Sequence, residues 1–479
     1  MRRRSVLRAV GSGLALGSAG VATGHPTPNG DGTPPSETAA TDPLGTVPVE
    51  NTREMVLNDD GTVAYVATVD GFTVVDVSDP EAMTVLASTP VLPDHEDGPL
   101  GGIWDLHCDG DRLLVAGPAN GGGSLWGYGY FDVSDPASPE QLAGHETDFY
   151  VHNCFLHDGV SYFTGSGIEG SPLMILDAES GEELARWAAR DADERYADLP
   201  FGMVNLHDVW VAGDYAYLAY WDAGTWCLDV SEPADPALVS RIRGRPVEEL
   251  LAVEDTRREA TEPPGNDHFV TVDESGDLLG VGTESWAVDQ RPPGGPGGIE
   301  FYDVSDPSAP ELLGEITPPA TPDPTRGGVW TTSHNFELTS DRCYASWYQG
   351  GVTVHDLRDP TDPSELFRWR EADRGKFWTA QLAAPGEYFL GASIGAFGSN
   401  TDPEDSSLES GLFAFPDPSG STPSTEPSSS PTATDGDGST TTGQEQTPTS
   451  GTGAGAGLGA GLLGLGVGAW LRRRRHRSE

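Results

Sequence analysis

Lysine is almost absent from this chain of 479 residues, and basic residues as a whole are few. Lys376 is the only lysine, and lysine and arginine together number 27 against 75 aspartates and glutamates, which gives a formal net charge of −48. Contacts to phosphate require a basic surface, so this balance excludes a general nucleic-acid-binding protein. We therefore expect no nucleic-acid partner.

Cysteine is also rare, with four in the whole chain. That number excludes a disulfide scaffold, and we expect buried free thiols, although Cys108 and Cys154 could pair in an oxidising compartment. The sequence contains no Gly-x-Ser-x-Gly elbow, no phosphate-binding loop and no dinucleotide fingerprint. Aromatic residues, in contrast, are plentiful: 12 Trp, 13 Tyr and 15 Phe can build a core, so the acidity does not indicate a disordered chain.

The N-terminal residues have the pattern of an export signal. Residues 1–24 place Arg3 and Arg4 before a weakly apolar segment rich in glycine and alanine. This pattern resembles the twin-arginine signal peptide, and the segment is too short to be a good membrane span. Residues 25–43 are mostly Pro, Thr, Gly and Asp, which predicts a disordered linker. We therefore expect the protein to be exported.

The C-terminal residues predict an anchor. Residues 417–450 are almost all Ser, Thr, Pro, Gly and acidic residues, a composition that cannot bury a core and is typical of an extended stalk. Residues 451–471 carry no charge, and a basic tail, 472–479, follows them. About 20 apolar residues span a bilayer, with arginines on the cytoplasmic side. We expect an extracellular domain held at the cell membrane by a transmembrane or sorting-type segment.

A short motif recurs through residues 44–416. It joins an apolar strand to a turn like Asp-x-Ser-Asp-Pro, and its copies are FTVVDVSDP at Phe72, GYFDVSDP at Gly129, LMILDAESG at Leu173, WCLDVSEP at Trp226, EFYDVSDP at Glu300, VTVHDLRDP at Val352 and a worn GLFAFPDP at Gly411. Several short strands with turn signals between them accompany each copy, which gives four strands per repeat. Seven such repeats predict an all-β fold, a seven-bladed β-propeller.

The seventh repeat lacks its own fourth strand, because the chain runs into the stalk. The segment Leu44–Val49 resembles the fourth strands elsewhere, such as Leu312–Thr317. We therefore predict that the N-terminal strand closes the last blade beside Leu412–Phe415, since this pairing covers the edges that an open ring would expose.

These repeats resemble those of the LVIVD-repeat β-propeller proteins, in which an apolar strand precedes Asp-Val-Ser-Asp-Pro and a short strand. The acidic, lysine-poor composition resembles the proteins of salt-loving archaea, whose surface carboxylates keep the chain hydrated when salt screens charge. Together the resemblances imply an exported, surface-anchored protein of haloarchaeal type. They imply no particular activity.

Histidines recur near the start of the expected first strand in five of the seven repeats. They are His107, His152, His207, His268 and His334, and each precedes the Asp of the next turn by 22 to 35 residues. The same count places Glu54 in the first repeat. One interpretation is inheritance from an ancestral blade whose imidazole bonded the backbone of its neighbour. The other is a ring of imidazoles at one mouth of the central channel, because the first strand of each blade is the innermost.

A ring of imidazoles suits one transition-metal ion, which could be Fe, Cu, Mn or Zn. Ligand bonds of ~2.0–2.2 Å limit the set to three or four of the candidates, and an open position would leave room for a substrate. The candidate ligands are His107, His152, His207, His268, His334 and Glu54. Several propeller enzymes set histidine ligands in a central channel, but this is a likeness of fold alone.

Aromatic residues are expected around the same mouth. They lie near the starts of first strands or in the loops between second and third strands, and comprise Trp104, Trp221, Trp286, Trp347, Tyr348 and Trp378. Such rings either pack between blades or line a pocket for a small ligand.

Three functions remain open from the sequence. The first is a cell-surface propeller that binds an unidentified ligand or another component of the envelope. The second is a metal-dependent oxidase, oxygenase or lyase that uses the channel histidines, and the third is a purely structural protein of the envelope. Tight convergence of the imidazoles favours the second function, and well-separated imidazoles bonded to the backbone favour the first.

Overall fold

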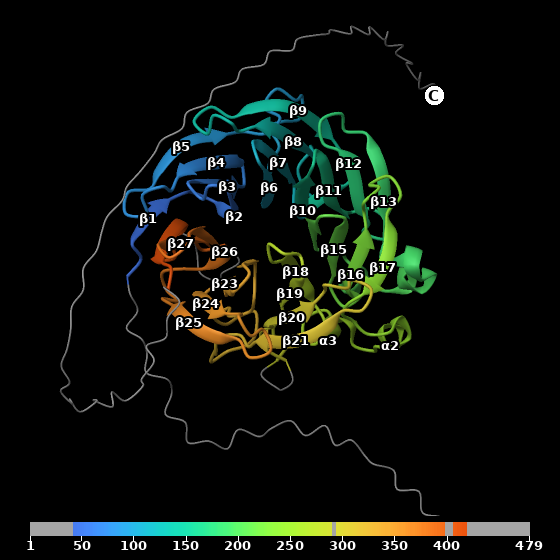
Figure 1. Cartoon of the computed structure of the whole chain (residues 1–479). Coiled ribbons are helices and arrows are strands. Elements are labelled where there is room, and N and C mark those ends of the chain that lie inside the picture. The colour runs from blue at the N-terminus through green and yellow to red at the C-terminus, as the bar shows by residue number, and fades with distance from the viewer. Residues whose placement is uncertain (1–41, 290–293, 398–405, 419–479) are drawn as a thin grey trace, which may run out of the picture. The chain divides into compact units, whose positions relative to one another are not determined.

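Seven four-stranded antiparallel sheets surround a central axis in the computed structural model of the protein, which describes residues 42–289, 294–397 and 406–418 (Figure 1). The prediction of an all-β, seven-bladed propeller is confirmed. The predicted signal peptide, nearly all of the linker and stalk, the anchor and the basic tail lie outside the described residues. Within those ranges, no helix has both the length and the apolar character needed to cross a membrane.

Each blade contains four strands, given in order from the innermost to the outermost. Blade 1 contains β2 (Thr52–Leu57), β3 (Val63–Thr68), β4 (Gly71–Asp76) and β5 (Thr84–Thr89); blade 2 contains β6 (Asp105–Asp109), β7 (Arg112–Gly117), β8 (Gly127–Asp132) and β9 (Glu140–Glu146); blade 3 contains β10 (Tyr150–His157), β11 (Val160–Ser166), β12 (Leu173–Asp177) and β13 (Glu183–Trp187).

The remaining blades follow the same order. Blade 4 contains β14 (Asp208–Ala212), β15 (Tyr215–Tyr220), β16 (Gly224–Asp229) and β17 (Ala237–Arg241); blade 5 contains β18 (Asp267–Val272), β19 (Leu278–Thr283), β20 (Ile299–Asp303) and β21 (Glu311–Ile316); blade 6 contains β22 (Phe336–Leu338), β23 (Arg342–Ser346), β24 (Val352–Asp356) and β25 (Ser364–Trp369); blade 7 contains β26 (Phe377–Ala384), β27 (Tyr388–Ile394), β28 (Ser410–Pro416) and β1 (Gly45–Pro48).

Short helices occupy two connections between blades. The connection from blade 3 to blade 4 contains α1 (Ala189–Ala192), η1 (Glu194–Asp198) and η2 (Phe201–Met203), and the next one contains α2 (Val247–Leu251) and α3 (Thr256–Glu259).

The N-terminal strand closes the ring. β1 pairs antiparallel with β28, from Gly45 opposite Ala414 to Pro48 opposite Gly411, and one further bond joins the Leu44 N–H to the Ala414 carbonyl at 2.7 Å. The predicted closure of the last blade is therefore confirmed.

Burial separates the strands of a blade into layers. In blade 1 the second and third strands, β3 and β4, are buried along almost their whole length, because both faces of each sheet pack against a neighbouring blade. The outermost strand, β5, is mostly exposed. The second and third strands are therefore mostly continuous apolar runs in the sequence, whereas a strand buried on one face only has alternating apolar and polar residues.

The Asp-x-Ser-Asp-Pro turn is built from side chains that bond its own backbone. Oδ1 of Asp76 accepts from the backbone N–H and the hydroxyl of Ser78 at 3.0 and 2.6 Å, and Oδ1 of Asp79 accepts from the Glu81 N–H at 3.0 Å. The same bonds recur in blade 5 at Asp303. Asp and Ser stabilise such turns by replacing backbone partners, so this motif is structural.

Three of the seven third strands, β4, β8 and β16, begin with glycine, where the backbone of the outermost strand or of the residues just after it approaches closely. A Cβ atom added to Gly71 would lie 2.3 Å from the Thr89 carbonyl oxygen, and one added to Gly224 would lie 2.1 Å from the Arg243 carbonyl oxygen. Both glycines also have φ between 91° and 153°, a region that side chains rarely adopt.

Candidate functional site

The innermost strands begin at one end of the channel, which we call the mouth. At this point several strands carry a β-bulge: in blade 3 the pairing shifts between Val151 and Cys154, and in blade 5 it shifts between Asp267 and Phe269. A bulge inserts an extra residue and turns its side chain out of the alternating pattern. His152 and His268 lie in these two bulges, which explains how a side chain that belongs to no sheet face is directed at the channel.

Four imidazoles gather at the mouth, from blades 3 to 6. Ring centroids are 4.2 Å apart for His152 and His207, 3.9 Å for His207 and His268, and 4.8 Å for His268 and His334. Trp378 continues the row, 4.0 Å from His334. Four of the five predicted histidines are therefore in contact.

His107 does not join this group. Its Nδ1 accepts from the Leu156 N–H at 3.3 Å, and its ring lies 3.7 Å from Phe155 and 6.0 Å from Trp210. Trp104, three residues earlier, takes the place of the histidine in blade 2, since its ring is 5.5 Å from His152. The prediction that His107 belongs to the ring is corrected accordingly.

Arg53 takes the corresponding place in blade 1, and Glu54 lies one position further along. The Glu54 N–H donates to the Trp104 carbonyl at 3.2 Å, as the Asn335 N–H donates to the Trp378 carbonyl at 3.0 Å. Glu54 therefore corresponds to Asn335, the residue that follows the blade 6 histidine. The Asn335 amide also donates to the Glu54 carboxylate, so the prediction that Glu54 replaces a ring histidine is corrected.

Three buried carboxyls form a second layer below the imidazoles, at Glu54, Asp105 and Asp208. Oδ2 of Asp105 accepts from the Cys154 N–H at 2.6 Å, and Oδ2 of Asp208 accepts from the Val270 N–H at 2.9 Å, so each joins its blade to the next. Burial raises the pKa of all three carboxyls to about 8. These groups are therefore mostly uncharged at neutral pH.

Three of the mouth imidazoles have Nδ1 bonded to a backbone carbonyl. The acceptors are Ala119 for His152 at 3.0 Å, His268 for His207 at 2.9 Å, and Trp378 for His334 at 2.7 Å. Because a carbonyl oxygen only accepts, Nδ1 carries the proton in each ring and Nε2 keeps its lone pair. Burial lowers the pKa of His334 to about 3 and that of His152 to about 4, so these rings are neutral.

His268 differs from the other three. It is 5% exposed, and its Nε2 is buried without a hydrogen-bond partner among the described residues. Its Nδ1 lies 3.3 Å from Oε2 of Glu284, which is longer than the ~2.7–2.9 Å of a charge-assisted N–H···O bond. Burial lowers the pKa of His268 well below its usual value, so a neutral imidazole lies beside a carboxyl group without a good hydrogen bond.

Glu284 brings a carboxyl group to the mouth, at the end of β19. Its Oε1 accepts from the Tyr348 hydroxyl at 2.6 Å, and burial raises its pKa to about 7. His268, Glu284 and His334 offer ligand atoms that all lie within 4.8 Å of one another. The metal prediction did not include Glu284, although the end of a second strand must lie beside the start of the first strand that it pairs with.

A small cavity lies below the mouth. Its volume is about 10 Å³, the order of space that one water molecule needs, and its lining joins both layers. The lining residues are Trp104, Asp105, His152, Asn153, His207, His334, Asn335 and Trp378.

Most of the predicted aromatic residues surround the mouth. Tyr348 lies 4.8 Å from His334, Trp221 stacks on His207 at 6.0 Å, and Trp104 meets Trp378 at 5.8 Å. Trp286 lies further out and contacts Trp330, whose ring is 5.2 Å from Tyr348.

Trp347 is the exception among the predicted aromatic residues. It is fully buried, its Nε1 donates to Oγ1 of Thr353 at 2.8 Å, and its ring belongs to the core formed by blades 5 and 6. Its assignment to the ligand mouth is corrected. The four cysteines, all within the described residues, are free, so Cys108 and Cys154 do not pair.

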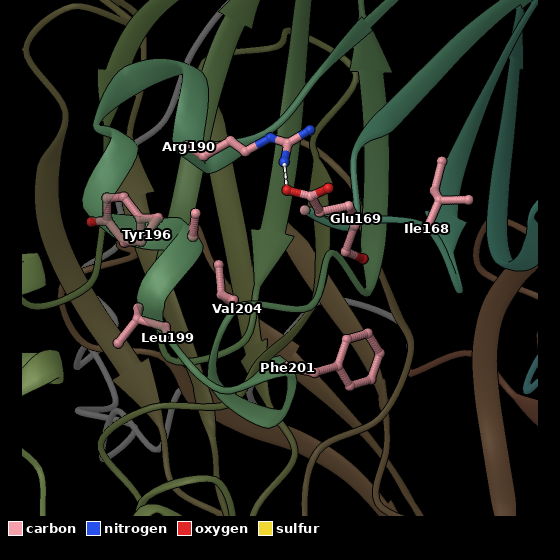
Figure 2. A pocket seen from close by; sticks show the side chains of 10 residues that line it. Ile168, Glu169, Arg190, Tyr196, Leu199, Phe201 and Val204 are labelled. Atoms are coloured by element: carbon pink, nitrogen blue, oxygen red, sulfur yellow. Dashed lines mark hydrogen bonds and ion pairs between the residues drawn. The ribbon is translucent and has the colours of Figure 1, made fainter.

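A separate pocket of about 240 Å³ opens beside the mouth, between the loop after β11 and the short helices before β14 (Figure 2). Its lining is mostly apolar, and an ion pair of 2.7 Å between Arg190 and Glu169 crosses one side. Phe201 is 52% exposed and lies 6.0 Å from Trp221, which stacks on His207. The pocket is thus one aromatic ring away from the imidazoles.

The fold and the site define a β-propeller with imidazoles and one carboxyl at the mouth of its channel. The β-propeller domain of Myceliophteria thermophila Cps50 (Swd1) is 12% identical, with a TM-score of 0.50 over 78% of this chain and 99% of that one. U3-55K is 9% identical, with a TM-score of 0.53 over 79% of this chain and 99% of its own. At these identities the likeness shows the fold alone.

Two segments of the sequence match a repeat family. Residues 60–89 and 205–243, which lie in blades 1 and 4, match the LVIVD repeat, so the chain is a seven-bladed β-propeller that carries LVIVD repeats. A comparison with curated proteins gave no match.

Proposed function

We propose that this propeller binds a small ligand at a transition-metal centre held by His268, His334 and Glu284. The state of His268 carries the proposal. Inheritance of a backbone-bonded histidine accounts for the other three imidazoles, each of which has a carbonyl partner. It does not account for His268, whose buried Nδ1 faces a carboxyl oxygen at 3.3 Å where the other three imidazoles have a carbonyl at 2.7 to 3.0 Å. A buried ring nitrogen without a good hydrogen bond is costly and calls for an explanation.

The donor set suits a transition metal. Two imidazoles and one carboxylate are typical ligands of iron, manganese, zinc and copper. Two ligands on a tetrahedral ion with bonds of ~2.1 Å are about 3.4 Å apart. His268 Nδ1 and Glu284 Oε2 already have this separation, and small rotations would bring in His334. Three protein ligands leave an open position, as sites that bind or transform a ligand require.

Metal analysis of the purified full-length chain tests the proposal. After separate dialysis against Fe, Mn, Zn and Cu salts, the wild type is expected to retain about one ion per chain of at least one metal. The variant carrying His268→Ala and His334→Ala is expected to bind that metal at least about a hundredfold more weakly. Loss of a residue that hydrogen-bonds to a metal ligand already costs about 10–100-fold in affinity, and loss of two ligands should cost more.

His107→Gln is the matched control, because His107 is also an imidazole of the innermost strands but contacts Phe155 and Trp210 instead of the mouth. It should retain the metal. Equal metal content in the double variant, or a wild type that takes up none of the four metals, would refute the centre.

We also propose that the protein is exported and held at the cell membrane, on the strength of residues 1–24 and 451–471. Replacing Arg3 and Arg4 by lysine should leave the precursor in the cytoplasm, because the arginine pair is the feature that the export route recognises. Ending the chain at Ser450 should release the propeller into the medium. Fractionation and immunoblotting measure both results, and surface display of either variant contradicts the corresponding part.

A further inference from the structure

Three of the chain's few cationic side chains gather around the proposed centre. The mouth cations are Arg53, Arg326 and Lys376, in a protein with 27 basic and 75 acidic residues. Arg53 and Lys376 are 5% and 0% exposed, whereas Arg326 is exposed and lies 4.1 Å over the Trp286 ring. An acidic chain that places rare cations in one buried region needs a reason for that placement.

Lys376 is held by aromatic rings and one carbonyl. Its Nζ lies 3.8 Å from the centre of the Trp330 ring and 5.6 Å from that of Tyr348, and it donates to the Phe397 carbonyl at 2.7 Å. These contacts fix the ammonium beside Tyr348, whose hydroxyl is bonded to Glu284. They satisfy one of three N–H donors and supply no negative charge. Burial accordingly lowers the pKa of Lys376 to about 7, and an anion beside the amine would favour its charged form.

Arg53 faces the same group of rings from blade 1. Its Cζ lies 4.0 Å from the centre of the Phe397 ring and 5.6 Å from that of Trp104, and Nη1 donates to the Thr52 carbonyl at 2.7 Å. Its Nε is buried and has no hydrogen-bond partner in the part of the chain that the structure describes. A guanidinium in this state has an unused donor and an unbalanced charge.

Among the described residues, the charges around the mouth do not balance. No ion pair joins Arg53, Arg326 or Lys376 to a carboxylate within residues 42–289, 294–397 and 406–418. The Glu284 carboxyl interacts electrostatically with Arg326 and Lys376, but it already accepts a hydrogen bond from the Tyr348 hydroxyl. A divalent ion bound to Glu284 would leave this region more positive still. Buried cations are stable only when anions or good hydrogen bonds compensate them.

From this geometry we infer that the ligand is a small organic carboxylate, held by Arg53 and Lys376. The inference rests on the proposed function, because it names the ligand class of the same site. A guanidinium fork binds a carboxylate through two parallel hydrogen bonds, and an ammonium adds a point charge. The indole rings of Trp104 and Trp330, over which the two cations lie, would contact the apolar part of such a molecule.

Calorimetric titration of the full-length chain with benzoate tests the inference, and benzamide, its neutral isostere, is the control ligand. Metal-loaded wild type is expected to bind benzoate at least about tenfold more tightly than benzamide, since hydrogen bonds to charged groups are the stronger ones. Arg53→Gln and Lys376→Met should each weaken benzoate at least about tenfold without changing metal content. If Lys376→Met fails to fold, Lys376→Arg is the variant to test. It keeps the positive charge and should retain benzoate binding.

Arg241→Gln is the matched control variant, because Arg241 is also a partly buried arginine over an indole, 5.8 Å from the Trp226 ring, but lies in the outermost strand of blade 4. It should bind benzoate as the wild type does. A metal-loaded wild type that does not bind benzoate, binds benzamide equally well, or is unaffected by Arg53→Gln overturns the carboxylate site and leaves the metal centre intact. A chain without metal uptake that still binds benzoate through Arg53 and Lys376 supports the carboxylate site and refutes the centre.

Discussion

Deleting residues 44–49 should destabilise the entire propeller by several kcal/mol. The deletion removes β1 and leaves β28 with an unpaired edge in blade 7. It also removes Val47 and Val49, which are 7% and 5% exposed in the core that blades 1 and 7 share. Burial of each valine contributes about 1.5–3 kcal/mol, a large share of the ~5–15 kcal/mol that stabilise a typical domain. Guanidinium unfolding followed by circular dichroism, at constant salt, measures the loss.

Two point variants separate the closure from a general effect of the N-terminal segment. Val47→Asp places a charge in the shared core and should reproduce most of the loss, whereas Thr46→Asp changes an exposed neighbour in the same strand and should have little effect. A deletion variant that unfolds at the same denaturant concentration as the parent would contradict the closure.

Raising the pH from about 6.5 to 8 is expected to destabilise the metal-free protein. The pKa values of Glu54, Asp105 and Asp208 are raised to about 8, chiefly by burial, whereas such groups titrate near ~4 in an unfolded chain. Between these values the folded chain binds protons that the unfolded chain has released, so the free energy of unfolding falls as pH rises. The buried imidazoles, with lowered pKa values, have the opposite effect, but only below ~6.5. Burial lowers the pKa of Lys376 to about 7, so this one group also opposes the loss above that pH, against three carboxyls.

Asp208→Asn and Glu54→Gln should each remove about 1–2 kcal/mol of this pH-dependent loss. The measurement is the unfolding midpoint in guanidinium at several pH values with EDTA present. Asp229→Asn is the control, because its turn serine lowers the pKa of Asp229 and confines its effect to acidic pH. If the unfolding midpoint falls with pH equally in Asp208→Asn and in the wild type above pH 6.5, ionisation of these carboxyls does not destabilise the fold, and the prediction is wrong.

The fold was predictable because its signals are local and repeated. The turn at Asp76 recurs in blades 1, 2, 4, 5 and 6 through bonds within a few residues, and blade 3 has a related turn at Asp177, so the spacing of these turns predicted the number of blades. The closure by Leu44–Val49 was predictable because the seventh repeat lacks a fourth strand, and the chain has one extra strand of that kind before the first repeat. Neither required knowledge of side-chain contacts.

The site was predictable only in part, because the count that aligned the histidines ran through loops of unequal length. The turn between the first and second strands is a better reference. His152, His207 and His268 precede its left-handed glycine by 6 to 8 residues, as Trp104 does in blade 2, whereas His107 precedes it by only three. That count would have separated His107 from the others. No residue pattern in the sequence indicates the bulge between Thr52 and Met55. The sequence therefore could not predict that Arg53, and not Glu54, takes the position of the histidine in blade 1.

Because the first and last strands of the propeller pair in blade 7, both ends of the domain lie on one face, and this face can be compared with the position of the imidazoles. Innermost strands begin at the mouth, and antiparallel order makes third strands end at the opposite face. β28 therefore ends, and β1 begins, on the side away from the imidazoles. A tether joined to either end of the propeller is attached to its back, which leaves the mouth unobstructed for molecules that arrive from the surroundings.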